Sequence, residues 1–160
     1  MKEKVAITGG AGFIGSHLCE QLLAAGHQVL CLDNLSLGSE SNIAHLRENT
    51  NFQFIKADLL DTSVMHEICT KYAIDTIYHL AANSDIQAGS QTLSIDLEKT
   101  LQTTLSCLDC IRTFQIKKLV FASSSAVYGR FPSPMHEESG PCRPVSFYGA
   151  AKLAAENFIH

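Results

Sequence analysis

Short apolar segments alternate along the chain with longer segments in which apolar residues recur every three or four positions. The short segments are typical of strands buried on both faces, and the periodic ones are typical of amphipathic helices. We expect strands at 5–8, 28–32, 51–56, 76–80 and 118–122, and helices at 13–25, 64–72, 94–114 and 147–160. Gly26 directly follows the first helix, where a C-terminal cap is usual.

This alternation predicts an α/β fold. Strands that alternate with helices form a parallel sheet with helices on both faces, and right-handed crossovers leave few arrangements. We expect one domain over residues 1–160, with a doubly wound parallel sheet in strand order 3-2-1-4-5. Ligands then bind at the carboxyl ends of the first and fourth strands. The proline-rich loop from Gly129 to Pro144 is long, and such loops are usually functional or mobile.

A glycine-rich loop, Thr8-Gly-Gly-Ala-Gly-Phe-Ile-Gly15, lies between the first strand and the first helix. Gly9 permits a tight turn, Gly12 lets the backbone approach a pyrophosphate, and Gly15 lets the helix pack closely. The first N–H groups of the helix and its dipole favour phosphate binding. The alternative, a glycine-rich turn without a ligand, fits this spacing and context much less well.

An acidic residue, Asp33, ends the second strand 24 residues after Gly9. A carboxylate there accepts hydrogen bonds from the adenosine ribose and repels a 2′-phosphate. Residues 34–39 contain no Arg or Lys, so we expect NAD rather than NADP. Asp58 and Leu59 follow the third strand, where a side chain can reach the adenine. Taken alone, Asp58 fits a helix N-cap equally well.

Three residues near the C-terminal end are candidates for catalysis. Tyr148 and Lys152 are four positions apart in the last helix and therefore share a face. A tyrosine is a poor base at neutral pH, but a nearby ammonium favours its phenolate. Tyr148 could then remove a proton from a substrate hydroxyl during hydride transfer. This pair is common by chance, but the serine cluster 123–125 ends the fifth strand on the ligand side of the sheet.

Five motifs stand in the order seen in extended short-chain dehydrogenases/reductases: TGGAGFIG (8–15), DNLSLGS (33–39), HLAA (79–82), ASSSAVYG (122–129) and YGAAK (148–152). The chain resembles the NAD-dependent epimerase/dehydratase branch of that family, which includes the UDP-glucose 4-epimerases. The resemblance implies that Ser124, Tyr148 and Lys152 are catalytic. It implies that the cofactor contacts are Gly9, Gly12, Phe13, Ile14, Gly15, Asp33, Asn34, Asp58, Leu59, Leu80, Ala81, Ala82, Tyr148 and Lys152.

The residues after Ser124 favour one reaction of that family. Dehydratases of the family usually place Asp-Glu there and decarboxylases Ser-Glu, whereas this chain has Ser125 and Ala126. The resemblance therefore implies epimerisation of a UDP- or dTDP-sugar: hydride passes to NAD, the keto sugar rotates, and hydride returns to its other face. A dehydratase or a 4-ketoreductase stays open as an alternative. The resemblance also implies a homodimer formed through helices 94–114 and 147–160.

Two departures from the family pattern support another hypothesis. The usual Asn-Val-x-Gly-Thr segment has Thr100 for the Asn and Thr103 for the Gly, which adds bulk. The chain also stops at His160, about half the family length, so we expect a truncated chain without the C-terminal substrate domain. Substrate positioning and water exclusion depend on such a domain. The isolated chain is then a nucleotide-binding module with little or no turnover.

Composition and charge exclude several other classes. The formal net charge is −4 and no basic stripe is present, so nothing favours nucleic-acid binding. No apolar run approaches a bilayer span and the N-terminus resembles no signal peptide, so we expect no membrane partner and a cytoplasmic location. The six cysteines sit in apolar patterns or lack further ligands, which favours reduced thiols over disulfides or a metal.

Overall fold

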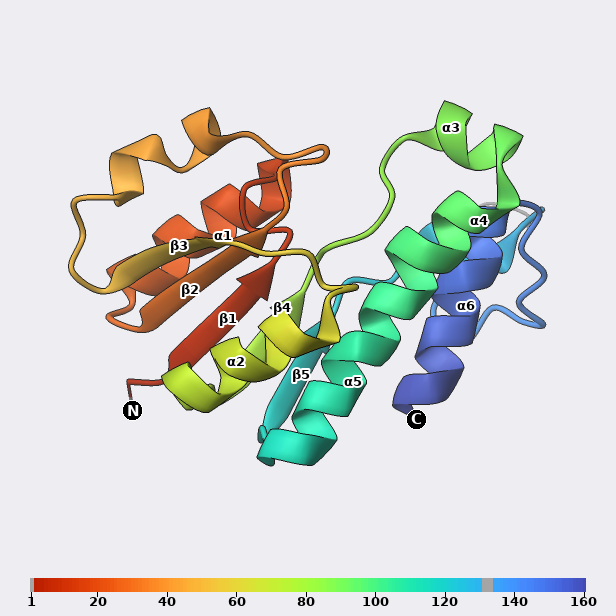
Figure 1. Cartoon of the computed structure of the whole chain (residues 1–160). Helices are drawn as coiled ribbons and strands as arrows, with labels where there is room; N and C mark the ends of the chain where they lie inside the picture. Colours follow the sequence, from red (N-terminus) through yellow and green to blue (C-terminus); the bar gives the residue numbers. More distant parts are fainter. Residues whose placement is uncertain (1, 131–133) are drawn as a thin grey trace. The chain divides into compact units, whose positions relative to one another are not determined.

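Five parallel strands form one sheet in the order β3-β2-β1-β4-β5, which confirms the expected topology (Figure 1). The computed structural model describes residues 2–130 and 134–160, so Pro132 of the proline-rich loop lies outside the described residues. The strands are β1 (Lys4–Thr8), β2 (Gln28–Asp33), β3 (Phe52–Lys56), β4 (Thr76–His79) and β5 (Lys118–Phe121).

Helices cover both faces of this sheet. Residues of α1 (Phe13–Ala24) pack in the core on one face, and residues of α2 (Thr62–Tyr72) and α5 (Thr103–Phe114) pack in the core on the other. A further long helix of the chain is α6 (Phe147–Ile159). Shorter helical segments are η1 (Glu40–Asn42), η2 (Ala44–Leu46), α3 (Ile86–Gln91), α4 (Leu93–Asp96), η3 (Leu97–Gln102) and η4 (Ser125–Tyr128). None of the helices in the described part of the chain is long and apolar enough to cross a membrane.

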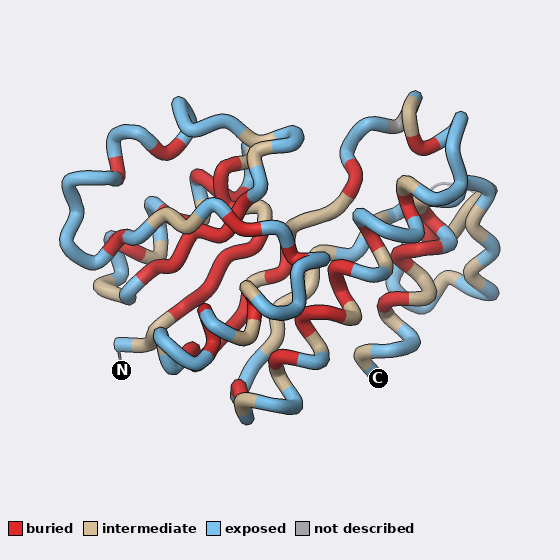
Figure 2. The backbone as a smooth tube through the Cα atoms, viewed as in Figure 1, coloured by how far each residue is buried: buried red, intermediate tan, exposed pale blue. Residues whose placement is uncertain are grey.

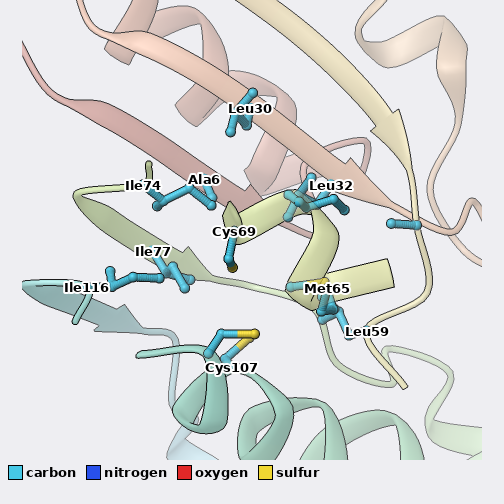
Figure 3. Packing of buried hydrophobic residues seen from close by; sticks show 13 residues of the cluster. Ala6, Leu30, Leu32, Leu59, Met65, Cys69, Ile74, Ile77, Cys107 and Ile116 are labelled. Carbon is cyan, nitrogen blue, oxygen red and sulfur yellow. The ribbon is translucent and has the colours of Figure 1, made fainter. Parts of the chain in front are cut away.

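Alternate residues of β1 enter two separate cores, as strand geometry requires. Val5 and Ile7 of β1 pack with α1, whereas Ala6 packs with α2 and α5. Strands β1 and β2 are buried along almost their whole length, which explains their continuous apolar sequence (Figure 2). Figure 3 shows the core that the sheet forms with α2 and α5, where Met65 and Cys69 of α2 lie near Cys107 of α5.

The first helix ends as expected. Gly26 has φ +86° and its N–H donates to the Leu23 carbonyl at 2.9 Å, while the His27 N–H donates to Leu22 at 3.0 Å. These two bonds form a Schellman motif and satisfy carbonyls that the helix leaves unpaired. Gly26 therefore serves as the C-terminal cap that its position predicts.

The single helix expected over 94–114 is wrong in detail. The chain forms α4 and then a π-helical turn, η3, before α5 begins, and the separate helix α3 precedes them. Thr103 donates to the Lys99 and Thr100 carbonyls, and Thr104 donates to Thr100. Threonine hydroxyls that bond to preceding carbonyls disturb regular helix geometry, which accounts for the irregular turn at this point.

Two compact units make up the chain. The first comprises residues 1–81 and 106–122 and contains the sheet with both cores. The second comprises residues 82–105 and 123–160, in which α6 packs against α3, α4, η3 and η4. The expected single domain over 1–160 stays a prediction.

All six cysteines are free thiols, and five of them are buried. A hydrogen bond that the Cys31 thiol donates to Cys19, together with burial, raises the pKa of Cys31, and a hydrogen bond that the Cys110 thiol donates to Cys69, together with burial, raises that of Cys110. Burial also raises the pKa of Cys107. Thiolates are the reactive form of cysteine, so these residues act as small apolar core residues.

Candidate functional site

The glycine-rich loop turns sharply at the carboxyl end of β1. Gly9 has φ +70°, and its N–H donates to the Leu32 carbonyl of β2 at 2.8 Å. A Cβ at Gly9 would lie 2.8 Å from the backbone nitrogen of Ala81, which follows β4. Both the positive φ and this close approach require glycine, so the loop is held at the ends of three adjacent strands.

The first turn of α1 packs directly on this loop. A Cβ at Gly15 would lie 2.2 Å from the Gly9 carbonyl oxygen and 2.7 Å from the Gly10 Cα. Gly12 is the N-cap and supplies no side-chain cap, and a Cβ there would meet only the Gly9 oxygen at 3.2 Å. Phe13 and Ile14 are 79% and 67% exposed. This N-terminus therefore has the backbone access and dipole that favour a phosphate.

Asp33 lies at the end of β2 beside the loop, as the sequence predicts. Its two carboxylate oxygens accept hydrogen bonds from the Ala11 N–H at 3.0 Å and the Leu35 N–H at 2.8 Å. A Cβ at Gly38 would lie 2.9 Å from the same carboxylate. Each carboxylate oxygen has a further lone pair, so the group can accept ribose hydroxyls while it holds the loop.

We expect Asp33→Asn to weaken NAD binding about tenfold and to reduce the preference for NAD over NADP. An amide carries no charge to repel a 2′-phosphate, and it can accept only one of the two backbone N–H groups. Calorimetric titration with both nucleotides checks this, with Asp109→Asn, an exposed position on α5, as the control. An equal loss for both nucleotides would show that Asp33 only supports the loop.

Asp58 contacts Asn34 rather than capping α2. Its carboxylate accepts the Asn34 amide at 3.1 Å and the Leu60 N–H at 2.9 Å. Asp61 is the N-cap of α2, accepting the Val64 N–H at 3.2 Å, so the N-cap alternative for Asp58 is wrong. Leu59 is buried in the core, so any contact it makes with a nucleotide would come from its backbone.

The segment after β4 is fixed to β1. Leu80 donates its N–H to the Thr8 carbonyl at 3.1 Å, and Ala81 donates to the Thr8 hydroxyl at 3.4 Å. That hydroxyl also shares a 2.7 Å hydrogen bond with Nδ1 of the buried His79. Leu80, Ala81 and Ala82 are all half-buried, with Ala82 beginning the second unit.

Tyr148 and Lys152 lie on α6 in the second unit. The Ser146 hydroxyl caps this helix by accepting the Gly149 N–H at 3.0 Å, which places Tyr148 in its first turn. Lys152 is only 2% exposed, and its Nζ lies 5.8 Å from the centre of the Tyr148 ring. Burial lowers the pKa of Lys152 to about 8, and the Glu156 carboxylate acts in the opposite direction.

Ser124 is brought to the same helix by a glycine that sequence reasoning missed. A Cβ at Gly149 would lie 2.5 Å from the Ala126 carbonyl oxygen, so glycine lets η4 pack closely on the start of α6. The Ser124 hydroxyl oxygen accepts the Ala126 N–H at 3.2 Å. A hydroxyl that accepts in this way keeps its own proton for donation to a further oxygen.

The second unit also contains a buried polar network that the sequence did not predict. The Asn83 N–H donates to the Thr100 hydroxyl at 3.1 Å, and its amide donates to Asp96 at 3.0 Å. Thr100, at the position of the family's usual Asn, therefore holds the segment after HLAA through its hydroxyl. No apolar spacing marks Asp96 and Thr100 as buried, because Leu93 and Leu97 in the same segment are exposed. Among the described residues, no group of three or more His, Cys, Asp or Glu could hold a metal ion.

Proteins related to this chain are sugar-nucleotide epimerases. A putative UDP-glucose 4-epimerase of Methanocaldococcus jannaschii is 34% identical over 97% of this chain and 49% of its own length. A UDP-glucose 4-epimerase of Halalkalibacterium halodurans is 35% identical over 98% of this chain and 45% of its own. The chain thus spans about half the length of the curated relatives it matches.

Solved structures agree over the same range. The UDP-Glc/GlcNAc 4-epimerase of Campylobacter jejuni matches with a TM-score of 0.92 and 31% identity, over 98% of this chain and 48% of that one. The Thermus thermophilus UDP-glucose 4-epimerase in complex with NAD matches with a TM-score of 0.88 and 36% identity, over 98% of this chain and 49% of that one. The sequence model of the NAD dependent epimerase/dehydratase family matches residues 5–160. The chain belongs to the NAD-dependent epimerase/dehydratase family, which confirms the resemblance found in its motifs.

Proposed function

We propose that this chain is the nucleotide-binding half of an NAD-dependent epimerase that acts on a sugar nucleotide. The observation that carries the proposal is the buried Lys152 beside Tyr148 on α6. A buried ammonium is costly, and proteins keep such groups mainly where they perform a function. The family and the epimerase activity of its relatives add support.

The phosphate loop and Asp33 fit the cofactor. Gly12 and the exposed first turn of α1 leave room for a pyrophosphate, and the Asp33 carboxylate has lone pairs for ribose hydroxyls. NAD bound there would take hydride from a sugar carbon and return it to the opposite face of the keto sugar. These same residues support NAD over NADP, because Asp33 repels a 2′-phosphate.

Each of the three catalytic candidates has a separate role in this proposal. Tyr148 removes the proton from the sugar hydroxyl and later returns it. Lys152 favours the phenolate of Tyr148 through its positive charge. Ser124 donates its proton in a hydrogen bond to the substrate oxygen, since the Ala126 N–H occupies its acceptor side. Together they move one proton while the substrate oxygen stays bound.

The residues beside Ser124 favour epimerisation over dehydration. Ser125 and Ala126 in η4 carry no carboxylate for acid–base chemistry at a second carbon. Several relatives are UDP-sugar epimerases, and one solved relative is described with UDP-glucose. We therefore propose a UDP- or dTDP-sugar as substrate.

We also propose the expected homodimer. Its support is a set of exposed apolar residues on α4, η3 and α6: Leu93, Leu97, Phe147 and Phe158.

Two measurements test the proposed function. In a calorimetric titration, we expect this chain to bind NAD and to bind NADP much more weakly. In the complete protein, we expect interconversion of UDP-glucose and UDP-galactose, and Tyr148→Phe should slow it by about 10²- to 10⁴-fold while NAD still binds. Tyr72→Phe, a half-buried tyrosine of α2, is the control.

Three outcomes would separate the hypotheses. NAD binding without turnover of any UDP- or dTDP-sugar would leave a binding module and remove the epimerase. A 4-keto product that has lost its 6-hydroxyl as water would indicate a dehydratase, and reduction of a 4-keto sugar to a 4-hydroxyl would indicate a ketoreductase. Absence of NAD binding by this chain would mean that its phosphate loop and Asp33 do not form a working site by themselves.

A further inference from the structure

The acidic residue Glu156 lies one helical turn after Lys152 on α6. Residues four apart on a helix share a face, so the carboxylate lies on the same side as the buried ammonium. Glu156 is half-buried, and its Oε1 accepts a hydrogen bond from the Ser123 hydroxyl. Ser123 directly precedes the catalytic candidate Ser124. The segment that carries Ser124 therefore also contacts α6 one helical turn after Lys152.

Burial and the Glu156 carboxylate shift the pKa of Lys152 in opposite directions. Removal from water disfavours the ammonium, whereas a neighbouring carboxylate favours it. Burial lowers the pKa of Lys152 to about 8, and without the Glu156 charge the pKa would be lower still. An uncharged Lys152 would give the neighbouring Tyr148 no electrostatic help, so the proposed chemistry depends on this balance.

Other charged groups near α6 do not replace Glu156. The elements packed on α6 carry Asp96 on α4, Glu98 and Lys99 on η3, and Tyr128 on η4. Asp96 bonds to Asn83, and Glu98 and Lys99 are exposed. The Glu156 carboxylate raises the pKa of Lys152 against the effect of burial. Burial, Glu137, Cys142 and Glu156 raise the pKa of Tyr128, which keeps that phenol neutral.

We propose that Glu156 is a positioning residue that keeps Lys152 charged at neutral pH, and that Ser123 orients the Glu156 carboxylate for this role. The meaning for catalysis rests on the proposed function, because it is there that the Lys152 charge supports Tyr148. The electrostatic relation itself involves only this chain's own residues. It can therefore be measured without cofactor or substrate.

The test is an NMR titration of the lysine side-chain Cε and Nζ signals of this chain. We expect the Lys152 midpoint near pH 8 in the wild type, and lower by about 0.5 to 2 pH units in Glu156→Gln. Ser123→Ala should lower it in the same direction by less, since the carboxylate stays but loses its hydrogen bond. Glu156→Asp keeps the charge and should restore part of the shift.

A matched control shows whether the Glu156 charge itself sets the Lys152 midpoint. Glu98→Gln removes an exposed carboxylate from η3 and should leave the Lys152 midpoint unchanged. An unchanged midpoint in Glu156→Gln, or an equal shift in Glu98→Gln, would overturn the proposal. If Glu156→Gln does not fold, Ser123→Ala decides: a wild-type Lys152 midpoint in that variant would also overturn the proposal. A lowered midpoint in Glu156→Gln, together with no turnover of any UDP- or dTDP-sugar by the complete protein, would support this inference while refuting the proposed epimerase.

Discussion

Gly15→Ala should destabilise the chain by about 2 to 3 kcal/mol and weaken NAD binding by more than about tenfold. The added Cβ would lie 2.2 Å from the Gly9 carbonyl oxygen and 2.7 Å from the Gly10 Cα. Both neighbours are backbone atoms, so no side-chain rotation relieves the contact. The start of α1 must then move away from the loop, and its N–H groups no longer point at the expected pyrophosphate position.

Denaturant unfolding and calorimetric titration of the same variant measure the two effects. Gly140→Ala is the control, because a Cβ there meets no atom within 4 Å. Gly12→Ala provides a graded comparison: its Cβ meets only one loop oxygen at 3.2 Å, so binding should suffer more than stability. Wild-type stability and affinity in Gly15→Ala would refute the close packing of α1 on the loop.

The sheet and the phosphate loop could be predicted from the sequence because local pattern and topology agree there. The alternation of strands and helices leaves few arrangements, and the buried strands β1 and β2 carry continuous apolar sequence. Gly9 needs a positive φ and Gly15 a close approach, and no other residue type meets either need. Glycine spacing therefore carries structural information even without a ligand.

The second unit was harder to predict, because it depends on particular side-chain hydrogen bonds that no local sequence pattern shows. Asn83 bonds to Thr100, and Ser123 bonds to Glu156, 33 positions away. Helical spacing alone also hides the π-helical turn, which depends on where the Thr103 and Thr104 hydroxyls bond. Asp58 shows the same limit: a choice between N-cap and contact with Asn34 needs the position of the neighbouring strand.

Lys152→Met should make the chain more stable than the wild type at pH 7, and this advantage should shrink as the pH rises. Burial lowers the Lys152 pKa to about 8, against 10.5 for the ordinary side chain. Between these values the unfolded chain binds more protons than the folded one, so wild-type stability rises with pH. The rise should amount to about 3 kcal/mol, and methionine removes it because it does not titrate.

Urea unfolding of both proteins from pH 7 to pH 10 measures the difference, and contributions from the buried cysteines cancel because both chains share them. Lys99→Met, which removes an exposed lysine of η3, should run parallel to the wild type throughout. Parallel curves for Lys152→Met would mean that Lys152 is solvated and not held as a costly buried charge. Stability curves that converge as the pH rises would show that the wild-type chain retains Lys152 as a buried charge at the expense of stability.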